Sequence, residues 1–161
     1  MIGFGLRGMF KLKHFRSGVL IAEHAFPNAV VDLGANLLLE TMFRGATQRT
    51  WFIGLISSGV VLNNADTMGS HAGWTELAAY SEGARPQWIV NNPAATRRLV
   101  NAGPDAGIFH FTAAATLAGA FLSDDATKGG SAGVLFCTAT VTSLSLVAGD
   151  AVTVSYQLQV T

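Results

Sequence analysis

The chain has 161 residues, the size of one ordinary domain with a single hydrophobic core. Ten basic and ten acidic residues cancel, so the sequence offers no general attraction for nucleic acid, and a nucleic-acid reader is not expected. A single cysteine, Cys137, excludes the class of small secreted domains held by intramolecular disulfides, and its apolar surroundings predict a buried, unreactive thiol.

The low charge of the chain predicts a surface that is covered by other subunits. Only 12% of the residues are Asp, Glu, Lys or Arg, against about 25% in a typical soluble domain. Because interface cores are depleted in charge, we expect copies of this chain or other proteins to cover part of it, with a dimer as the favoured homo-oligomer. The alternative is a monomer with a surface rich in uncharged polar residues.

The N-terminal part predicts a β-hairpin preceded by a basic arm. Extended patterns over residues 9–16 and 19–26 flank Ser17-Gly18, and they place Phe10, Leu12 and His14 on one face. Residues 1–8 are expected to be a flexible arm and residues 9–161 a single domain. Basic residues interrupt any apolar signal-peptide core, so we expect synthesis and assembly in the cytoplasm.

One helix is expected, over residues 31–44. Pro27-Asn28 should end the second strand of the hairpin, and apolar residues at helical spacing then run to Gly45, a typical helix stop.

The stretch from Trp51 to Trp88 holds all three tryptophans and one of the two tyrosines. Residues 51–57 form a continuous apolar run and are predicted to be a buried strand. Residues 63–86 have no regular pattern, and a loop of this length is usually functional or packed against a partner. We therefore expect a partner interface that includes Trp74, Tyr80 and Trp88, together with the basic residues Arg7, Lys11 and Lys13.

The C-terminal half predicts short strands separated by turns. They are expected at 97–101, 107–113, 117–122, 138–147 and 151–161, and the last two should pair through the turn Ala148-Gly149-Asp150. This spacing favours an all-β fold, an antiparallel sandwich or jelly roll. Residues 106–123 are uncharged, but His110, Thr112 and Thr116 interrupt them, so buried strands are expected there and a membrane span is not.

Motifs that could carry chemistry are weak, and no catalytic, cofactor-binding or metal-binding residue is predicted. Residues 3–8 match G-x-G-x-x-G, but a strand and not a helix should follow. Ser70-His71, near Asp66 and Glu76, lacks the geometry that a triad needs. Neither the four histidines nor Asp124-Asp125 have metal-ligand spacing, although His14 and His24 could be cross-strand neighbours.

Several segments resemble a group of small structural proteins of tailed bacteriophages. They are WFIGLI, ADTMGSHAGWTELAAYSEGARPQW, GAFLSDD and GDAVTVSY, which together span roughly residues 50–161. The resemblance implies a virion protein, and some members of this size are capsid cement proteins, sandwich or jelly-roll subunits that clamp neighbouring major capsid proteins.

The sequence is also compatible with two other functions. The aromatic residues of the 51–88 stretch could form a sugar-binding platform on a tail or fibre protein. An enzyme is the third option and would need a cleft in which His71 or His110 meets a carboxylate.

Overall fold

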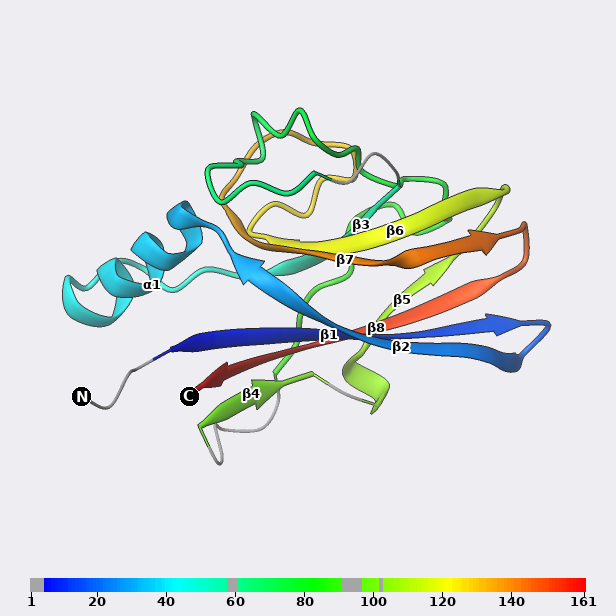
Figure 1. Cartoon of the computed structure of the whole chain (residues 1–161), viewed down its shortest axis with the longest axis horizontal. Coiled ribbons are helices and arrows are strands. Elements are labelled where there is room, and N and C mark those ends of the chain that lie inside the picture. Colours follow the sequence, from blue (N-terminus) through cyan, green and yellow to red (C-terminus); the bar gives the residue numbers. More distant parts are fainter. Residues whose placement is uncertain (1–4, 58–60, 91–96, 102) are drawn as a thin grey trace.

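The computed structural model describes residues 5–57, 61–90, 97–101 and 103–161 of the chain. Eight strands and one α-helix make up this part (Figure 1). In chain order they are β1 (Leu6–Arg16), β2 (Val19–Val30), α1 (Asp32–Phe43), β3 (Phe52–Ile56), β4 (Arg98–Val100), the short 3-10 helix η1 (Gly103–Asp105), β5 (Gly107–His110), β6 (Ala115–Ser123), β7 (Leu135–Leu146) and β8 (Ala151–Val160). The predicted all-β class with one helix is confirmed.

The strands form one antiparallel sheet that curls into a half-barrel. Its order is β3-β6-β7-β2-β1-β8-β4, and β5 also pairs with β8. Strand β2 connects the two halves, because it pairs with β1 along most of its length and with β7 only at Ala29 and Val30. The halves diverge from this junction (Figure 1). A closed two-sheet sandwich or jelly roll does not follow from this pairing.

The predicted hairpin is confirmed, with a longer second strand. Phe10, Leu12 and His14 are buried on its inner face, and Ser17 and Gly18 make the turn with positive φ angles of 50° and 78°. Pro27 and Asn28 do not end β2, which runs to Val30. Proline is tolerated there because this part of β2 is a sheet edge, where a missing N–H breaks no ladder bond.

Part of the predicted N-terminal arm belongs to the sheet. Residues 1–4 lie outside the described residues, but Leu6 to Gly8 belong to β1 and pair with Val160 to Leu158 of β8. The Gly5 amide also donates to the Thr161 carbonyl at 2.9 Å. The pairing of residues 5–8 is favourable because it gives hydrogen-bond partners to the backbone groups at the end of β8.

The predicted pairing of the last two strands is wrong. β7 pairs with β6 and, at its start, with β2, whereas β8 pairs with β1, β4 and β5. The turn before β8 therefore carries the chain from one half of the sheet to the other. It is held by Asp150, whose buried carboxylate accepts bonds from His14 Nε2 at 2.7 Å, Arg16 Nε at 2.8 Å and the Val147 amide at 3.0 Å.

The core fills the concave side of the half-barrel. Phe10 stacks on Phe26 and contacts Tyr156, with ring centroids 5.8 and 4.6 Å apart. The predicted strand at residues 51–57 is confirmed as the buried β3, and residues 106–123 form β5 and β6. Within the described residues, no helix has the length and apolar character to cross a membrane.

A buried arginine organises the long irregular segment after β3. Arg85 is 2% exposed, and its Nε and Nη2 donate to the two carboxylate oxygens of Glu76 at 3.0 and 2.7 Å. Nη2 also donates to the Gly130 carbonyl, and Nη1 donates to the Asp125 carbonyl and the Ser123 hydroxyl. All five guanidinium donors therefore have acceptors, so two loops and the end of β6 are tied together.

Replacing Arg85 should destabilise the protein strongly. Arg85→Met removes the cation that pairs with the nearly buried Glu76 carboxylate and the donor to two carbonyls, so we expect the free energy of unfolding to fall by about 3–5 kcal/mol. The matched control is Arg44→Met, which removes an exposed ion pair with Glu40 and should cost about 0.5 kcal/mol or less. Urea unfolding followed by tryptophan fluorescence measures both, and equal losses would contradict the role given to Arg85.

Asp150 should make the fold sensitive to acid. Its hydrogen bond with Arg16 holds the pKa of the carboxyl well below its ordinary value in the folded chain. A lowered folded-state pKa stabilises the fold above the ordinary pKa of Asp, and this stability is lost as the pH falls from about 5 downward. Asp150→Asn should therefore lower stability at neutral pH and flatten the acid side of the stability profile.

The control for this change is Glu23→Gln, at an exposed carboxylate 3.8 Å from Lys13. It should leave the pH profile of the unfolding free energy close to that of the wild type. An Asp150→Asn profile parallel to the wild-type profile would show that this carboxylate does not drive acid unfolding.

Candidate functional site: an apolar cavity beside helix α1

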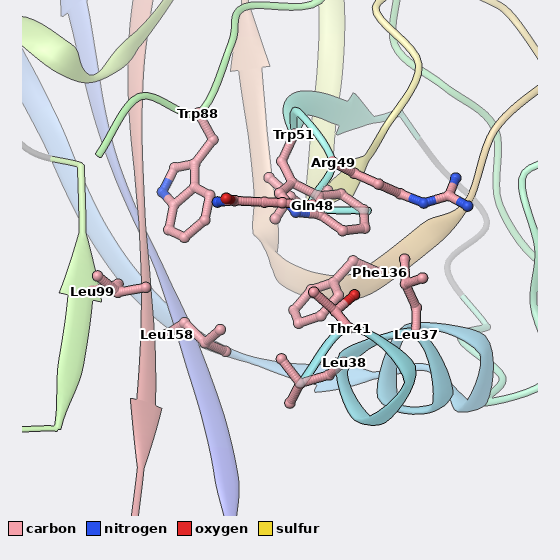
Figure 2. A pocket seen from close by; sticks show the side chains of 11 residues that line it. Leu37, Leu38, Thr41, Gln48, Arg49, Trp51, Trp88, Leu99, Phe136 and Leu158 are labelled. Carbon is pink, nitrogen blue, oxygen red and sulfur yellow. The ribbon is translucent and has the colours of Figure 1, made fainter. Parts of the chain in front are cut away.

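A cavity of about 260 Å³ lies between α1 and the inner face of the sheet (Figure 2). Segments far apart in sequence form its walls, namely the helix, the chain before β3, the chain around Trp88, and strands β4, β6, β7 and β8. The lining side chains are mostly large and apolar: Leu37, Leu38, Thr41, Gln48, Arg49, Trp51, Trp88, Leu99, Leu122, Phe136 and Leu158. Concave apolar sites at the mouths of barrels are common places for ligands.

The start of α1 is fixed against β7 by close backbone contact. Gly34, the buried residue of the helix, faces the backbone of Phe136, and a Cβ at this position would collide with the Phe136 carbonyl. The Val31 amide donates to the same carbonyl at 3.1 Å. The helix is thereby held where Leu37 and Leu38 face the sheet and form one wall of the cavity.

Two indole rings form the opposite wall, and both are held in place. Trp51 packs against Phe136 with ring centroids 5.2 Å apart. Trp88 donates from Nε1 to the Tyr156 carbonyl at 3.0 Å and makes an edge contact with the Tyr156 ring. The Trp88 amide donates to the Trp51 carbonyl at 2.8 Å. Because these contacts fix both rings, the cavity is formed before any ligand arrives.

Three of the residues that line the cavity are polar. They are Thr41, Gln48 and Arg49, and Arg49 is paired with Asp124. A neighbouring hollow of about 480 Å³ shares Gln48, Arg49 and both indoles, and adds Thr50 and Gln87 among its lining residues. Among the described residues, no acid, histidine or cysteine lines either space. The arrangement suits the burial of an apolar or aromatic group, with a few polar side chains nearby for hydrogen bonds.

The outer side of α1 is also apolar. Leu39, Met42 and Phe43 have 55%, 66% and 76% of their surface exposed. These side chains lie outside the face that meets the sheet, and the only buried residue of α1 is Gly34. The end of the molecule that carries the cavity therefore also presents an unusually apolar surface to its surroundings.

Two of the aromatic residues predicted to lie in a partner interface are buried, contrary to the prediction. Trp74 and Tyr80 are 4% and 3% exposed. Trp74 donates from Nε1 to Asp66 at 3.0 Å and stacks on His71, while Tyr80 packs edge-on against Phe109. The long segment folds back on its own chain, so these rings pack within it and are not available to a partner.

The other predicted interface residues are accessible. Trp88 is half-buried and borders the cavity. Arg7, Lys11 and Lys13 alternate along β1, so they share its exposed outer face. Sequence reasoning missed the cavity, although α1 carried a signal: more apolar residues than one buried helix face requires.

The residues of the G-x-G-x-x-G match and of the Ser70-His71 group have structural roles where the structure describes them. Gly3 and Phe4 lie outside the described residues, and Gly8 is part of β1, so a strand follows as predicted. His71 Nδ1 lies 3.0 Å from the Trp74 carbonyl, and Glu76 binds Arg85.

The histidine and acidic candidates are spread over the molecule. His14 and His24 are not direct neighbours, because they pair with Ala22 and Leu12. His110 Nδ1 does meet a carboxylate, Glu82, at 2.6 Å, but the histidine side chain is 61% exposed and neither residue lines the cavity. Asp124 and Asp125 face Arg49 and Arg85.

Cys137 is buried as predicted, and burial raises the pKa of its thiol to about 12. In the part of the chain that the structure describes, no group of three potential metal ligands comes together. Comparison with protein-family models, with curated proteins and with solved structures finds no match.

The cavity should bind a small aromatic probe. We expect saturation-transfer NMR to detect toluene on the wild-type protein, since apolar cavities of this kind take up benzene-sized molecules. Leu38→Phe should fill the cavity and weaken the signal. The matched control is Leu39→Phe, on the exposed side of the same helix, which should leave it unchanged. Equal signals from the two variants would place the probe elsewhere.

Proposed function

We propose that this chain is a non-enzymatic structural protein of a tailed-bacteriophage virion, a capsid cement or decoration protein that clamps neighbouring major capsid proteins. The sequence segments that resemble phage structural proteins support the virion part of the proposal. The charge-poor composition supports a protein whose surface is covered in an assembly. The protein is made in the cytoplasm of the host bacterium and acts on the capsid surface.

The exposed apolar face of α1 is the observation that carries this proposal. Leu39, Met42 and Phe43 would be covered by the major capsid protein, and each apolar side chain buried in this way contributes about 1.5–3 kcal/mol before the costs of association. The basic residues Arg7, Lys11 and Lys13 offer a second contact for an acidic patch on the shell. A sandwich or jelly-roll architecture and self-association as a dimer belong to the same proposal.

A carbohydrate-binding or receptor-binding module of a tail or fibre is the second candidate. It is favoured by Trp51 and Trp88, which line a hollow together with Gln48 and Gln87. Aromatic faces beside amide groups suit sugar rings, which present both C–H surfaces and hydroxyls. The predicted platform is reduced to these two indoles, because Trp74 and Tyr80 are buried.

Polar substitutions on α1 should remove the protein from capsids. We expect the triple variant Leu39→Gln, Met42→Gln, Phe43→Gln to show about a tenfold or greater loss of affinity for shells of the cognate major capsid protein, measured by co-sedimentation. Glutamine is a good helix former, so α1 should persist. The control is Val61→Gln, at another exposed apolar residue (72%) outside the helix, which should bind as the wild type does.

Cryo-EM of decorated shells should show the wild-type chain over the junctions between capsomers. The capsid proposal would be overturned if the shells did not bind the wild-type protein. It would also be overturned if they bound the triple variant as tightly as the wild type. Absence from the shell together with glycan binding that Trp88→Ala abolishes would favour the tail or fibre module.

A further inference from the structure

The outer edge of β2 is a long stretch of unpaired strand. Among the described strands, only β1 pairs with residues 19–28, and β7 joins β2 only at Ala29 and Val30. The ends of the sheet are protected differently: β4 and β5 have three and four residues, and the chain after β3 covers β3 through backbone bonds such as Leu77 to Leu55 at 2.8 Å. An open edge of this kind is a template for another extended strand.

Pro27 shows which backbone groups point to the open edge. Proline has no N–H, and within a sheet its nitrogen faces away from the neighbouring strand. Pro27 is paired with Met9 of β1, so its nitrogen must face outward. Because the direction of the N–H and C=O groups alternates along a strand, Ala25 and Glu23 also turn theirs to the open edge. Both residues are exposed.

We propose that this edge pairs with β2 of a second copy of the chain, antiparallel, about a two-fold axis that passes by His24. In this register Glu23 faces Ala25 of the partner subunit, and each pair exchanges both backbone hydrogen bonds. An axis at Glu23 would set two carboxylates opposite each other, which is unfavourable. An axis at Ala25 would set Glu23 opposite Pro27 of the partner subunit, so the missing N–H of proline would lie next to the centre of the pairing. The axis at His24 moves Pro27 to the end of the paired stretch, opposite Ile21 of the partner subunit.

The properties of β2 favour a second copy as the occupant. Glu23 is the only charged residue between Val19 and Val30, so two such strands meet without an array of like charges. The exposed apolar tip of the hairpin also gains cover. Ile21, which is 49% exposed, comes to lie beside Pro27 of the partner subunit, and Leu20, which is 45% exposed, comes to lie beside Asn28 of the partner subunit. The pairing stops there, because β7 occupies the edge of β2 at Ala29.

A two-fold pair closes on itself and gives a dimer, not a fibre. The pairing rests on the β2 edge alone and does not depend on the capsid role. If both hold, the dimer presents one apolar α1 face from each copy, and two such faces are what a clamp between neighbouring capsid proteins requires.

A cysteine at the axis tests the register. His24 would face His24 of the partner subunit in a non-hydrogen-bonded pair, where the Cα atoms lie about 4.5 Å apart, within the range of disulfides. His24→Cys should form a disulfide-linked dimer under mild oxidation, detected by non-reducing electrophoresis. The matched control is Ala22→Cys on the same inner face of β2, which would face Phe26 of the partner subunit and should not cross-link.

Cross-linking of Ala22→Cys to the same extent would overturn this register. Cys137 does not interfere, because its thiol is buried.

A proline at the edge tests the hydrogen bonds. Ala25→Pro removes an outward-facing N–H without removing a bond to β1, whereas Ala25→Thr keeps the N–H and suits a strand. In analytical ultracentrifugation we expect the dimer of Ala25→Pro to be at least about tenfold weaker than that of the wild type or of Ala25→Thr. Thermal unfolding should show all three proteins folded.

Hydrogen exchange of the wild-type protein gives a readout that needs no substitution. The amides of Glu23 and Ala25 should exchange more slowly as the protein concentration rises. A wild-type chain that stays monomeric, with fast exchange at these amides at every concentration, would overturn the dimer. These experiments use the purified chain alone, so that result would leave shell binding through α1 untouched.

Discussion

The buried guanidinium of Arg85 is the contact on which much of the structure outside the sheet depends. A charge that is removed from water must be paired, and here one side chain satisfies acceptors from Glu76, Ser123, Asp125 and Gly130. The described residues between β3 and β4 have little regular structure of their own, so these bonds hold them in place. Trp88 follows Arg85 by only three residues, and the wall of the cavity is therefore placed by the same contact.

Asp150 holds the two halves of the sheet together through buried hydrogen bonds, as Arg85 holds the loops. The turn between β7 and β8 crosses from one half of the half-barrel to the other, and its carboxylate is held there by His14 and Arg16 of β1. These internal pairs also use several of the few charges that the chain has. Fewer are then left for the surface, and this strengthens the expectation from composition that subunits cover part of it.

Two surfaces of the molecule are incomplete in complementary ways. The outer side of α1 lacks cover for apolar side chains, and β2 lacks a neighbour for its backbone. The first need is satisfied by any apolar partner of suitable shape, whereas the second is satisfied only by an extended strand. This difference is why the proposed partners differ, a capsid protein for the helix and a second copy for the strand edge.

The sequence by itself determined the local elements. Alternation placed Phe10, Leu12 and His14 on the buried face of a hairpin, and helical spacing with Gly45 bounded α1, because these patterns depend on neighbours a few residues away. The sequence also indicated an apolar, charge-poor chain with a buried cysteine.

Only the tertiary structure decided which strands pair, and with them the site. β7 and β8 are adjacent in sequence and suggest a hairpin, yet they lie in different halves of the sheet. The buried carboxylate of Asp150, between them, bonds to Arg16 of β1 and holds this arrangement. Trp74 and Trp88 look alike in sequence, but one is enclosed by its own loop and the other lines a cavity. The physical reason is that strand pairing, loop packing and cavities come from contacts between residues far apart in the chain, which no local pattern records.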